Sequence, residues 1–237
     1  METEGKLSVV ATPIGNLEDI TLRALRTLKE ADYILCEDTR VTGKLLKHYE
    51  IKAKTRRYDA HSSEKSHETI LNDLKEGKHI ALVSDAGTPC VSDPGVLLIK
   101  TIHNHNNGHP MSIIMVEAIP GPSAVTSAFS ISGVTGNKFV FLGFVPHKKG
   151  RQTFFESLST YKMPVIFYES PHRIMKTLDS LKNMSDDNLP IDWKVIVARE
   201  LTKIHEEVVK GTPEEVFEYF IENPDHVRGE FVVMVTI

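Results

Sequence analysis

With 237 residues, of which 41% are apolar and 25% charged, the chain has the composition of a soluble globular protein with one large domain or two small ones. The formal net charge of −4 excludes binding to nucleic acid through bulk positive charge, so any RNA contact must come from local basic patches. The two cysteines, Cys36 and Cys90, are too few for a disulfide framework, and no apolar run reaches the roughly 20 residues of a membrane span, so we expect a cytoplasmic protein without membrane contact.

The first half of the sequence predicts strands and helices in alternation. Apolar runs rich in β-branched residues predict the strands, and apolar residues at helical spacing predict the helices. Asp19 is the expected N-cap of the first helix, and Asp93 followed by Pro94 is the expected entry of the fourth. The expected elements are strand 7–12, helix 20–28, strand 33–36, helix 41–49, helix 64–75, strand 79–84, helix 96–103 and strand 113–116. This order favours a mainly parallel sheet covered by helices.

In the second half the strands come closer together and predict a mixed sheet. The sequence Pro-Gly-Pro at 120–122 interrupts the chain, so we place a boundary between an N-terminal α/β domain, residues 1–119, and a C-terminal α/β domain, residues 120–237. The expected helices of the second domain are 123–130, 151–159, 173–182 and 213–221. Its expected strands are 139–144, 164–168, 194–198, 206–210 and 230–237.

Loops that follow strands of the first half are the most informative segments, because open α/β sheets bind ligands beyond the carboxyl ends of their strands. Residues 11–17 match neither the GxGxxG nor the Walker A pattern, and an ordinary strand-to-helix turn explains them equally well. Residues 84–95 contain Ser-Asp-x-Gly twice, and a helix cap at Asp93 explains only their second half. Asp85, at the end of a buried strand, can bind a hydroxyl or ammonium group. Residues 119–124 form a hinge that also begins a helix.

A set of segments in a fixed order resembles one known family: residues 12–17, 37–40, 84–95, 120–124, 168–173 and 198–203. From residue 7 to the end, the chain is similar to the ribosomal RNA small subunit methyltransferase I family, a branch of the tetrapyrrole methylases. The resemblance implies a two-domain tetrapyrrole methylase-like α/β fold, S-adenosylmethionine (SAM) in the cleft between the domains, and a homodimer. It further implies 2′-O-methylation of a cytidine ribose in the decoding region of small-subunit rRNA, either as RNA or as an assembled subunit.

The same resemblance assigns the SAM site to the strand-end loops. Around the first domain the implied residues are Pro13, Ile14, Gly15, Asp85, Gly87, Thr88, Ser123 and Ala124. From the second domain they are Phe167, Tyr168, Ala198 and Gly229. The apolar members are expected to pack on the adenine ring, which accepts aromatic and aliphatic walls.

A ribose 2′-hydroxyl is a weak nucleophile, so the reaction needs a proton acceptor or donors that stabilise the developing alkoxide. Charged residues of the matching segments are the candidates, and Asp38, His172 and Arg199 are among them. We take as the catalytic set Glu37, Arg40, Glu169, Arg173 and Glu200. For Glu37, Asp38 and Glu200, a solvated strand end or a salt bridge with a neighbouring arginine is at least as good an explanation. The segment 170–171 also reads as a helix cap, with serine at the N-cap and proline at N1.

Two basic patches can hold RNA phosphates, residues 52–57 and residues 147–151. We prefer the second, with Lys148, Lys149 and Arg151, because it directly follows an apolar run. A merely solvated lysine-rich surface is the alternative for both. The histidines at 103, 105 and 109 have no carboxylate or thiolate company, so we expect no metal.

Two other functions remain open. One is a methylase of the same fold that acts on a tetrapyrrole such as a precorrin or uroporphyrinogen, or on a modified histidine of elongation factor. The other is a non-catalytic RNA-binding factor in ribosome assembly, against which the acidic balance and the ligand-type loops argue. The segments 37–40 and 168–173 favour the rRNA methyltransferase.

Overall fold

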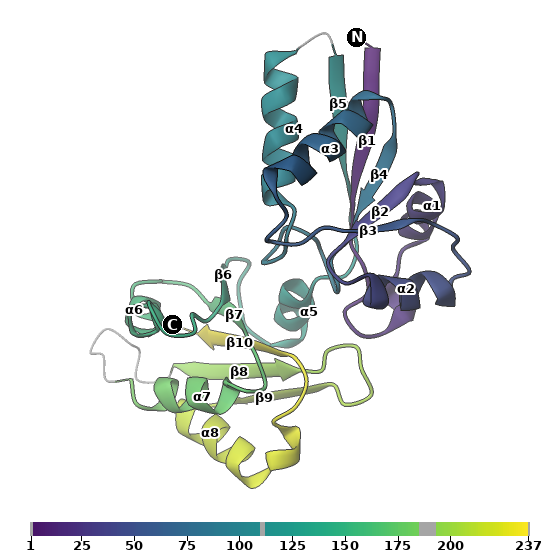
Figure 1. Cartoon of the computed structure of the whole chain (residues 1–237). Helices are drawn as coiled ribbons and strands as arrows, with labels where there is room; N and C mark the ends of the chain where they lie inside the picture. Colours follow the sequence, from purple (N-terminus) through teal and green to yellow (C-terminus); the bar gives the residue numbers. More distant parts are fainter. Residues whose placement is uncertain (1, 110–111, 185–192, 237) are drawn as a thin grey trace. The chain divides into compact units, whose positions relative to one another are not determined.

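The computed structural model describes residues 2–109, 112–184 and 193–236. The chain divides into two compact units, Met1–Ser123 and Ala124–Ile237, each built on a five-stranded sheet (Figure 1). The predicted fold class, with a parallel first sheet and a mixed second one, is confirmed. No helix in the described ranges has the length and apolar character needed to cross a membrane.

The first unit holds a parallel sheet with the strand order β3-β2-β4-β1-β5. Its strands are β1 (Glu2–Val10), β2 (Tyr33–Cys36), β3 (Thr55–Arg57), β4 (His79–Leu82) and β5 (Ser112–Ile119). The sequence pattern missed β3, which lies within the first basic patch. It is a short edge strand whose polar and charged residues lie mostly at the surface, so no apolar alternation marks it.

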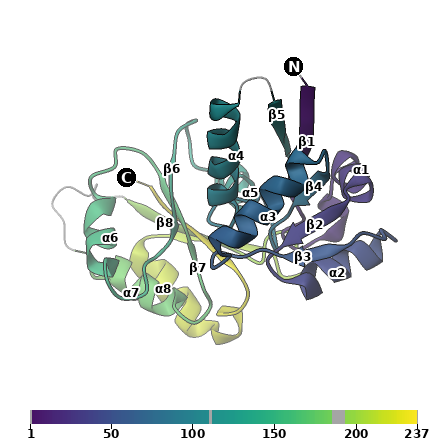
Figure 2. The same ribbon diagram turned by 45° about the horizontal axis from the view of Figure 1, so that its top comes forward.

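Helices cover both faces of this sheet (Figures 1 and 2). They are α1 (Leu22–Glu30), α2 (Thr39–His48), α3 (Glu64–Lys75) and α4 (Val96–Gly108). Side chains of α1 and α2 share a core cluster with Ile34, whereas those of α3 and α4 share another with Leu35. Successive residues of a strand point to opposite faces, so β2 supplies both cores.

Two predicted caps of the first unit are wrong. The hydroxyl of Thr21 accepts the backbone N–H of Ala24 at 3.1 Å and begins α1, whereas Asp19 ends a short 3-10 turn, η1 (Leu17–Asp19). The residue before α4 is Gly95, which has φ +129° and provides no side-chain cap. Asp93 therefore lies in the loop rather than at the helix start.

The second unit holds a mixed sheet with the order β6-β7-β10-β8-β9, in which only β6 and β7 are parallel neighbours among the paired strands described. Its strands are β6 (Val140–Phe144), β7 (Val165–Glu169), β8 (Lys194–Arg199), β9 (Glu207–Gly211) and β10 (Phe231–Thr236). Its helices are α5 (Ala124–Ile131), α6 (Arg151–Leu158), α7 (Ile174–Lys182), α8 (Pro213–Glu222) and the 3-10 turn η2 (Pro224–His226). The helices α6, α7 and α8 share one core cluster with β7, and Figure 1 shows α5 on the opposite side of the sheet from α7 and α8.

The predicted cap of α7 at Ser170 is also wrong. The backbone carbonyl of Ser170 accepts the N–H groups of Arg173 and Ile174, each at 3.0 Å, and closes a turn ahead of the helix. Arg173 takes the N-cap position, and its Nε donates to the Ser170 hydroxyl at 3.2 Å. This turn fixes the direction in which Arg173 leaves the backbone.

Candidate functional site

The loops after β1, β4 and β5 meet at the carboxyl edge of the first sheet. Thr12 and Gly87 exchange backbone hydrogen bonds of 2.9 and 3.0 Å, which join the loops after β1 and β4. The Thr12 hydroxyl donates to the Ser84 carbonyl at 3.2 Å. The Thr88 hydroxyl donates to the Pro122 carbonyl at 3.1 Å, which attaches the loop after β5. The three loops that the sequence singled out therefore form one continuous surface.

The residues predicted for the cofactor in the first unit lie on or just beneath this surface. Pro13 and Ile14 are buried, while Gly15 and Asp85 are exposed. Thr88 is half-buried and already tied to the neighbouring loop. The surface thus offers exposed backbone groups and the exposed carboxylate of Asp85 above an apolar floor, which is the usual composition of a small-molecule site.

The loop after β2 joins the same surface through Asp38. Its backbone N–H donates to Asp85 Oδ1 at 3.0 Å. The Asp38 carboxylate caps α2 by accepting the backbone N–H of Arg40 at 2.8 Å, and it also pairs with the Arg40 guanidinium at 2.6 Å. The hydrogen bonds from Arg40 hold the pKa of Asp38 well below its ordinary value. Arg40 has an 87% exposed side chain and serves here as the counterion of Asp38.

Negative charge accumulates at this edge. Burial and then repulsion from Asp85 raise the pKa of Glu37. Burial and then the Glu37 carboxylate raise the pKa of Asp93 to about 6. The sequence did not indicate Asp93 as a site residue. Its loop contains two non-glycine residues with positive φ, Cys90 (69°) and Ser92 (66°), and no sequence pattern predicts such a backbone. Such a group of carboxylates favours a cationic ligand.

Replacing Asp93 with asparagine should stabilise the ligand-free protein at pH 7.5 and change little at pH 4. The folded-state pKa of about 6 exceeds the ordinary 3.8, so ionisation of Asp93 lowers stability as the pH rises from about 4 to 6. Asparagine does not ionise, so it should raise the free energy of unfolding by about 2 kcal/mol above pH 7. Urea denaturation at both pH values measures the difference, with Glu222→Gln on the exposed surface of α8 as control. A gain of equal size at both pH values would contradict this account.

Glu169 and Arg173, both predicted to be catalytic, form a buried network in the second unit. The fully buried Glu169 carboxylate accepts hydrogen bonds from the Ser170 N–H at 2.7 Å and the Thr177 hydroxyl at 2.6 Å. It also pairs with Arg173 Nη2 at 2.7 Å, while Arg173 Nη1 donates to the Val145 carbonyl at 2.7 Å. Since both side chains are engaged with the protein itself, the geometry favours a positioning role for them.

Glu200 lies directly against Gly229. A Cβ added to Gly229, which has φ +87°, would lie 2.0 Å from Glu200 Oε1. That oxygen accepts hydrogen bonds from Lys203 Nζ at 2.7 Å and from the Glu230 N–H at 3.1 Å. Burial opposes ionisation of Glu200, but these hydrogen bonds outweigh it and lower its pKa. Glu200 is therefore a poorer proton acceptor than Glu37, and only glycine fits at position 229.

Of the other residues predicted for the cofactor in the second unit, Phe167 has a side chain that points into the core. Its side chain is 0% exposed and packs in the core, with its ring 5.2 Å from that of Phe154, so the Phe167 ring does not line a ligand surface. Tyr168 and Ala198 both pair with Val232 of β10 and lie on the other face of the sheet. Ala198 is fully buried, which leaves Tyr168 as the residue of this group with a partly exposed side chain.

The predicted RNA-binding residues differ in their surroundings. Lys148 and Lys149 are exposed in the turn before α6. Arg151 is buried, and its Nη2 donates to the Thr177 hydroxyl at 2.9 Å. In the alternative patch, residues 52–57, both arginines face aspartates at 3.0–4.0 Å. Across the described ranges, no three His, Cys, Asp or Glu side chains are grouped to hold a metal ion.

Comparisons with known proteins agree with this architecture. The sequence model of the family described as Tetrapyrrole (Corrin/Porphyrin) Methylases matches residues 6–216. The ribosomal RNA small subunit methyltransferase I of Thermotoga maritima is 44% identical over 91% of this chain and 92% of its own length. The protein of the same name from Halalkalibacterium halodurans is 43% identical over 99% of this chain and 76% of its own. Among solved structures, the uroporphyrin-III C-methyltransferase of Thermus thermophilus complexed with S-adenyl homocysteine has a TM-score of 0.65 at 19% identity, covering 98% of this chain and 97% of its own. At that identity, it supports the fold alone.

Proposed function

The chain belongs to the tetrapyrrole (corrin/porphyrin) methylase family, and from this premise we propose that it transfers a methyl group from SAM to the 2′-hydroxyl of a cytidine in the decoding region of small-subunit rRNA. The observation that carries the choice of substrate is the similarity to rRNA methyltransferases, which runs through both units. The fold alone does not select the substrate, because tetrapyrrole methyltransferases share it.

The carboxyl edge of the first sheet fits SAM, which when bound supplies an electrophilic methyl group on a positively charged sulfur. The carboxylates of Glu37, Asp85 and Asp93 favour a cation there, and Asp85 is exposed to bind ribose hydroxyls or the ammonium group. The contacts we propose from the strand-end loops are Pro13, Ile14, Gly15, Asp85, Gly87, Thr88, Ser123 and Ala124. From the second unit, the proposed contacts are the Tyr168 side chain and the backbones of Ala198 and Gly229.

We assign proton acceptance from the 2′-hydroxyl to Glu37. Its raised pKa moves it toward the range in which a carboxylate accepts a proton efficiently near neutral pH. Arg40, the exposed counterion of Asp38, is the cation of the proposed catalytic set. Glu169, Arg173 and Glu200 then hold the second unit in shape rather than contact the reacting atoms.

The proposed substrate also identifies the expected binding partner, small-subunit rRNA. Lys148 and Lys149 are exposed where RNA phosphates can reach them, and Arg151 lies beneath them. For a ribosomal substrate we expect the protein to act in the cytoplasm. We expect a homodimer, which light scattering of the purified protein tests.

Transfer of radiolabel from tritiated SAM tests the proposed function. The acceptors are small ribosomal subunits from a strain that lacks this methylation and, in parallel, free uroporphyrinogen. We expect label in the rRNA, on a cytidine ribose. Label confined to the tetrapyrrole contradicts the rRNA assignment, and RNA binding without any label indicates an assembly factor.

Replacing Asp85 with alanine should weaken SAM binding about tenfold. The change leaves a bound hydroxyl or ammonium group of SAM without its carboxylate partner, and an unpaired polar group in a binding site costs about 1–3 kcal/mol. Isothermal calorimetry measures the dissociation constant. Glu30→Ala is the matched control, because this exposed residue ends α1 at the amino edge of the sheet. Equal affinities of the Asp85 variant and the control would remove Asp85 from the site.

A further inference from the structure

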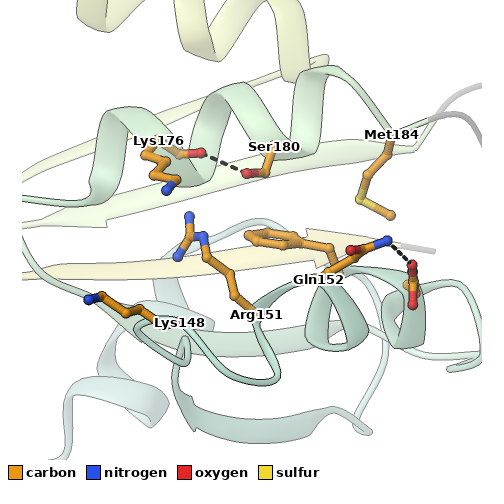
Figure 3. Close-up of a pocket in the computed structure, with 8 residues that line it drawn as sticks. Lys148, Arg151, Gln152, Lys176, Ser180 and Met184 are labelled. Carbon is orange, nitrogen blue, oxygen red and sulfur yellow. Dashed lines mark hydrogen bonds between the residues drawn. The ribbon is translucent and has the colours of Figure 1, made fainter.

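A pocket lies between α6 and α7 in the second unit, on the surface that continues from Lys148 (Figure 3). Its volume is about 490 Å³, within the roughly 300–1,000 Å³ of typical small-molecule sites. Both charged and apolar side chains line it: Lys148, Arg151, Gln152, Phe155, Glu156, Lys176, Ser180 and Met184. The pocket is lined entirely by the second unit and includes none of the residues proposed for SAM.

The lysines of the pocket carry positive charge that no carboxylate in the described part of the chain neutralises. Within residues 2–109, 112–184 and 193–236, neither Lys148 nor Lys176 forms an ion pair with a carboxylate. Glu156 is the acidic residue of the lining, and its Oε1 accepts a hydrogen bond from Gln152 Nε2 at 2.8 Å. The α6 N-terminus adds to the positive potential, because the preceding Gly150 provides no side-chain cap.

Arg151 adds a buried positive charge beneath these lysines. Its side chain is only 10% exposed, and its Nη1 has no hydrogen-bond partner in the described part of the chain. The nearest carboxylate oxygen, Glu169 Oε2, lies 3.6 Å away and already accepts the Thr177 hydroxyl. The other oxygen of Glu169 is paired with Arg173 at 2.7 Å. One carboxylate thus balances two guanidinium groups, and the excess positive charge favours an anion above it.

Phe155 and Met184 supply the apolar part of the lining. The Arg151 guanidinium lies over the Phe155 ring, 5.0 Å from its centroid. Met184 borders the same pocket, and Figure 3 shows it on the side away from Lys148. The lysines at one end of the pocket suit an anionic group, and the apolar side chains toward Met184 suit a planar ring. A nucleotide carries both groups, as its phosphate and its base. Aromatic, thioether and guanidinium groups all accept the face of a base.

We propose that this pocket binds one nucleotide of the substrate RNA, with its phosphate between Lys148 and Lys176 and its base toward Phe155 and Met184. The inference rests on the proposed function, because it takes the anion to be part of a ribosomal RNA. It adds Lys176 to the RNA-binding residues expected from the sequence. It also separates Lys148, which lines the pocket, from the adjacent Lys149, which does not.

The test compares Lys148→Glu/Lys176→Glu with Lys100→Glu/Lys162→Glu, which changes the net charge equally at exposed lysines outside the pocket. Fluorescence anisotropy with a labelled single-stranded RNA of the decoding-region sequence gives affinity as a function of salt. We expect the pocket variant to bind about tenfold more weakly, with a salt slope smaller by about 1–2. Its KM for small subunits should rise while its kcat and SAM affinity stay unchanged. Equal loss of affinity in both variants overturns the proposal.

Competition distinguishes a nucleotide site from a simple anion site. Cytidine 5′-monophosphate should displace the labelled RNA from the wild type at lower concentration than inorganic phosphate, and should lose this advantage in the pocket variant. Equal competition by inorganic phosphate overturns the nucleotide assignment. The labelling assay tests the proposed function separately. If that function is wrong, the wild-type protein leaves small subunits unlabelled, whatever the result of the binding assay with the pocket variant.

Discussion

Replacing Glu169 with alanine should lower the free energy of unfolding by about 3–5 kcal/mol, because it leaves buried arginines without their counterion. The Glu169 side chain is fully buried and lies within 3.6 Å of Arg151 and 2.7 Å of Arg173. Alanine also removes the acceptors of the Ser170 N–H and the Thr177 hydroxyl. Urea denaturation followed by circular dichroism measures the loss.

Two further variants separate a positioning role from catalysis. Glu169→Gln keeps the shape and part of the hydrogen bonding but not the charge, so its loss of stability should be intermediate. Glu156→Ala, on the exposed surface of α6, should change stability by less than about 0.5 kcal/mol. If Glu169→Ala were as stable as the wild type but had lost kcat, Glu169 would act on the substrate, contrary to the network described above.

Local signals in the sequence were sufficient for much of the fold. Strand β2 and helix α3 have the predicted bounds, since each is marked by its own apolar pattern and by polar residues at its ends. The helix caps were less predictable. Asp19 and Thr21 are both good capping residues two positions apart, and only the packing of α1 on the sheet decides between them.

The candidate site was also predictable only in part. Convergence of the loops around Thr12, Asp85 and Pro122 was predictable, because parallel neighbours end at the same edge of a sheet. Burial of Glu169 and Arg151 was not predictable. Each is a charged residue beside an apolar run, and the sequence does not reveal that they pair across the unit. Charged residues are almost never fully buried unless paired, and nothing in the sequence indicated that Arg151 would be buried beside Glu169.

Replacing Gly95 with alanine should destabilise the protein by about 3 kcal/mol, the sum of backbone strain and overpacking. Gly95 has φ +129°, a conformation that L-residues rarely adopt. A Cβ there would lie 2.5 Å from Cys90 Sγ and 2.7 Å from Leu82 Cδ2. Leu82 is 1% exposed in the core of the first unit, so its side chain cannot move away from the added methyl group without disturbing the packing. Chemical denaturation measures the cost.

The same change should weaken SAM binding, because Gly95 ends the loop that carries Asp85 and Asp93. Gly108→Ala is the control at the other end of α4: its added Cβ meets nothing within 4 Å in the described structure, so stability should stay equal or rise slightly. Adding Cys90→Ala to Gly95→Ala removes one clashing atom and should recover part of the loss. If Gly95→Ala were as stable as the wild type, the loop would have relaxed around the new methyl group. The positive φ angles of Cys90 and Ser92 would then not depend on the close contact of Gly95 with the core.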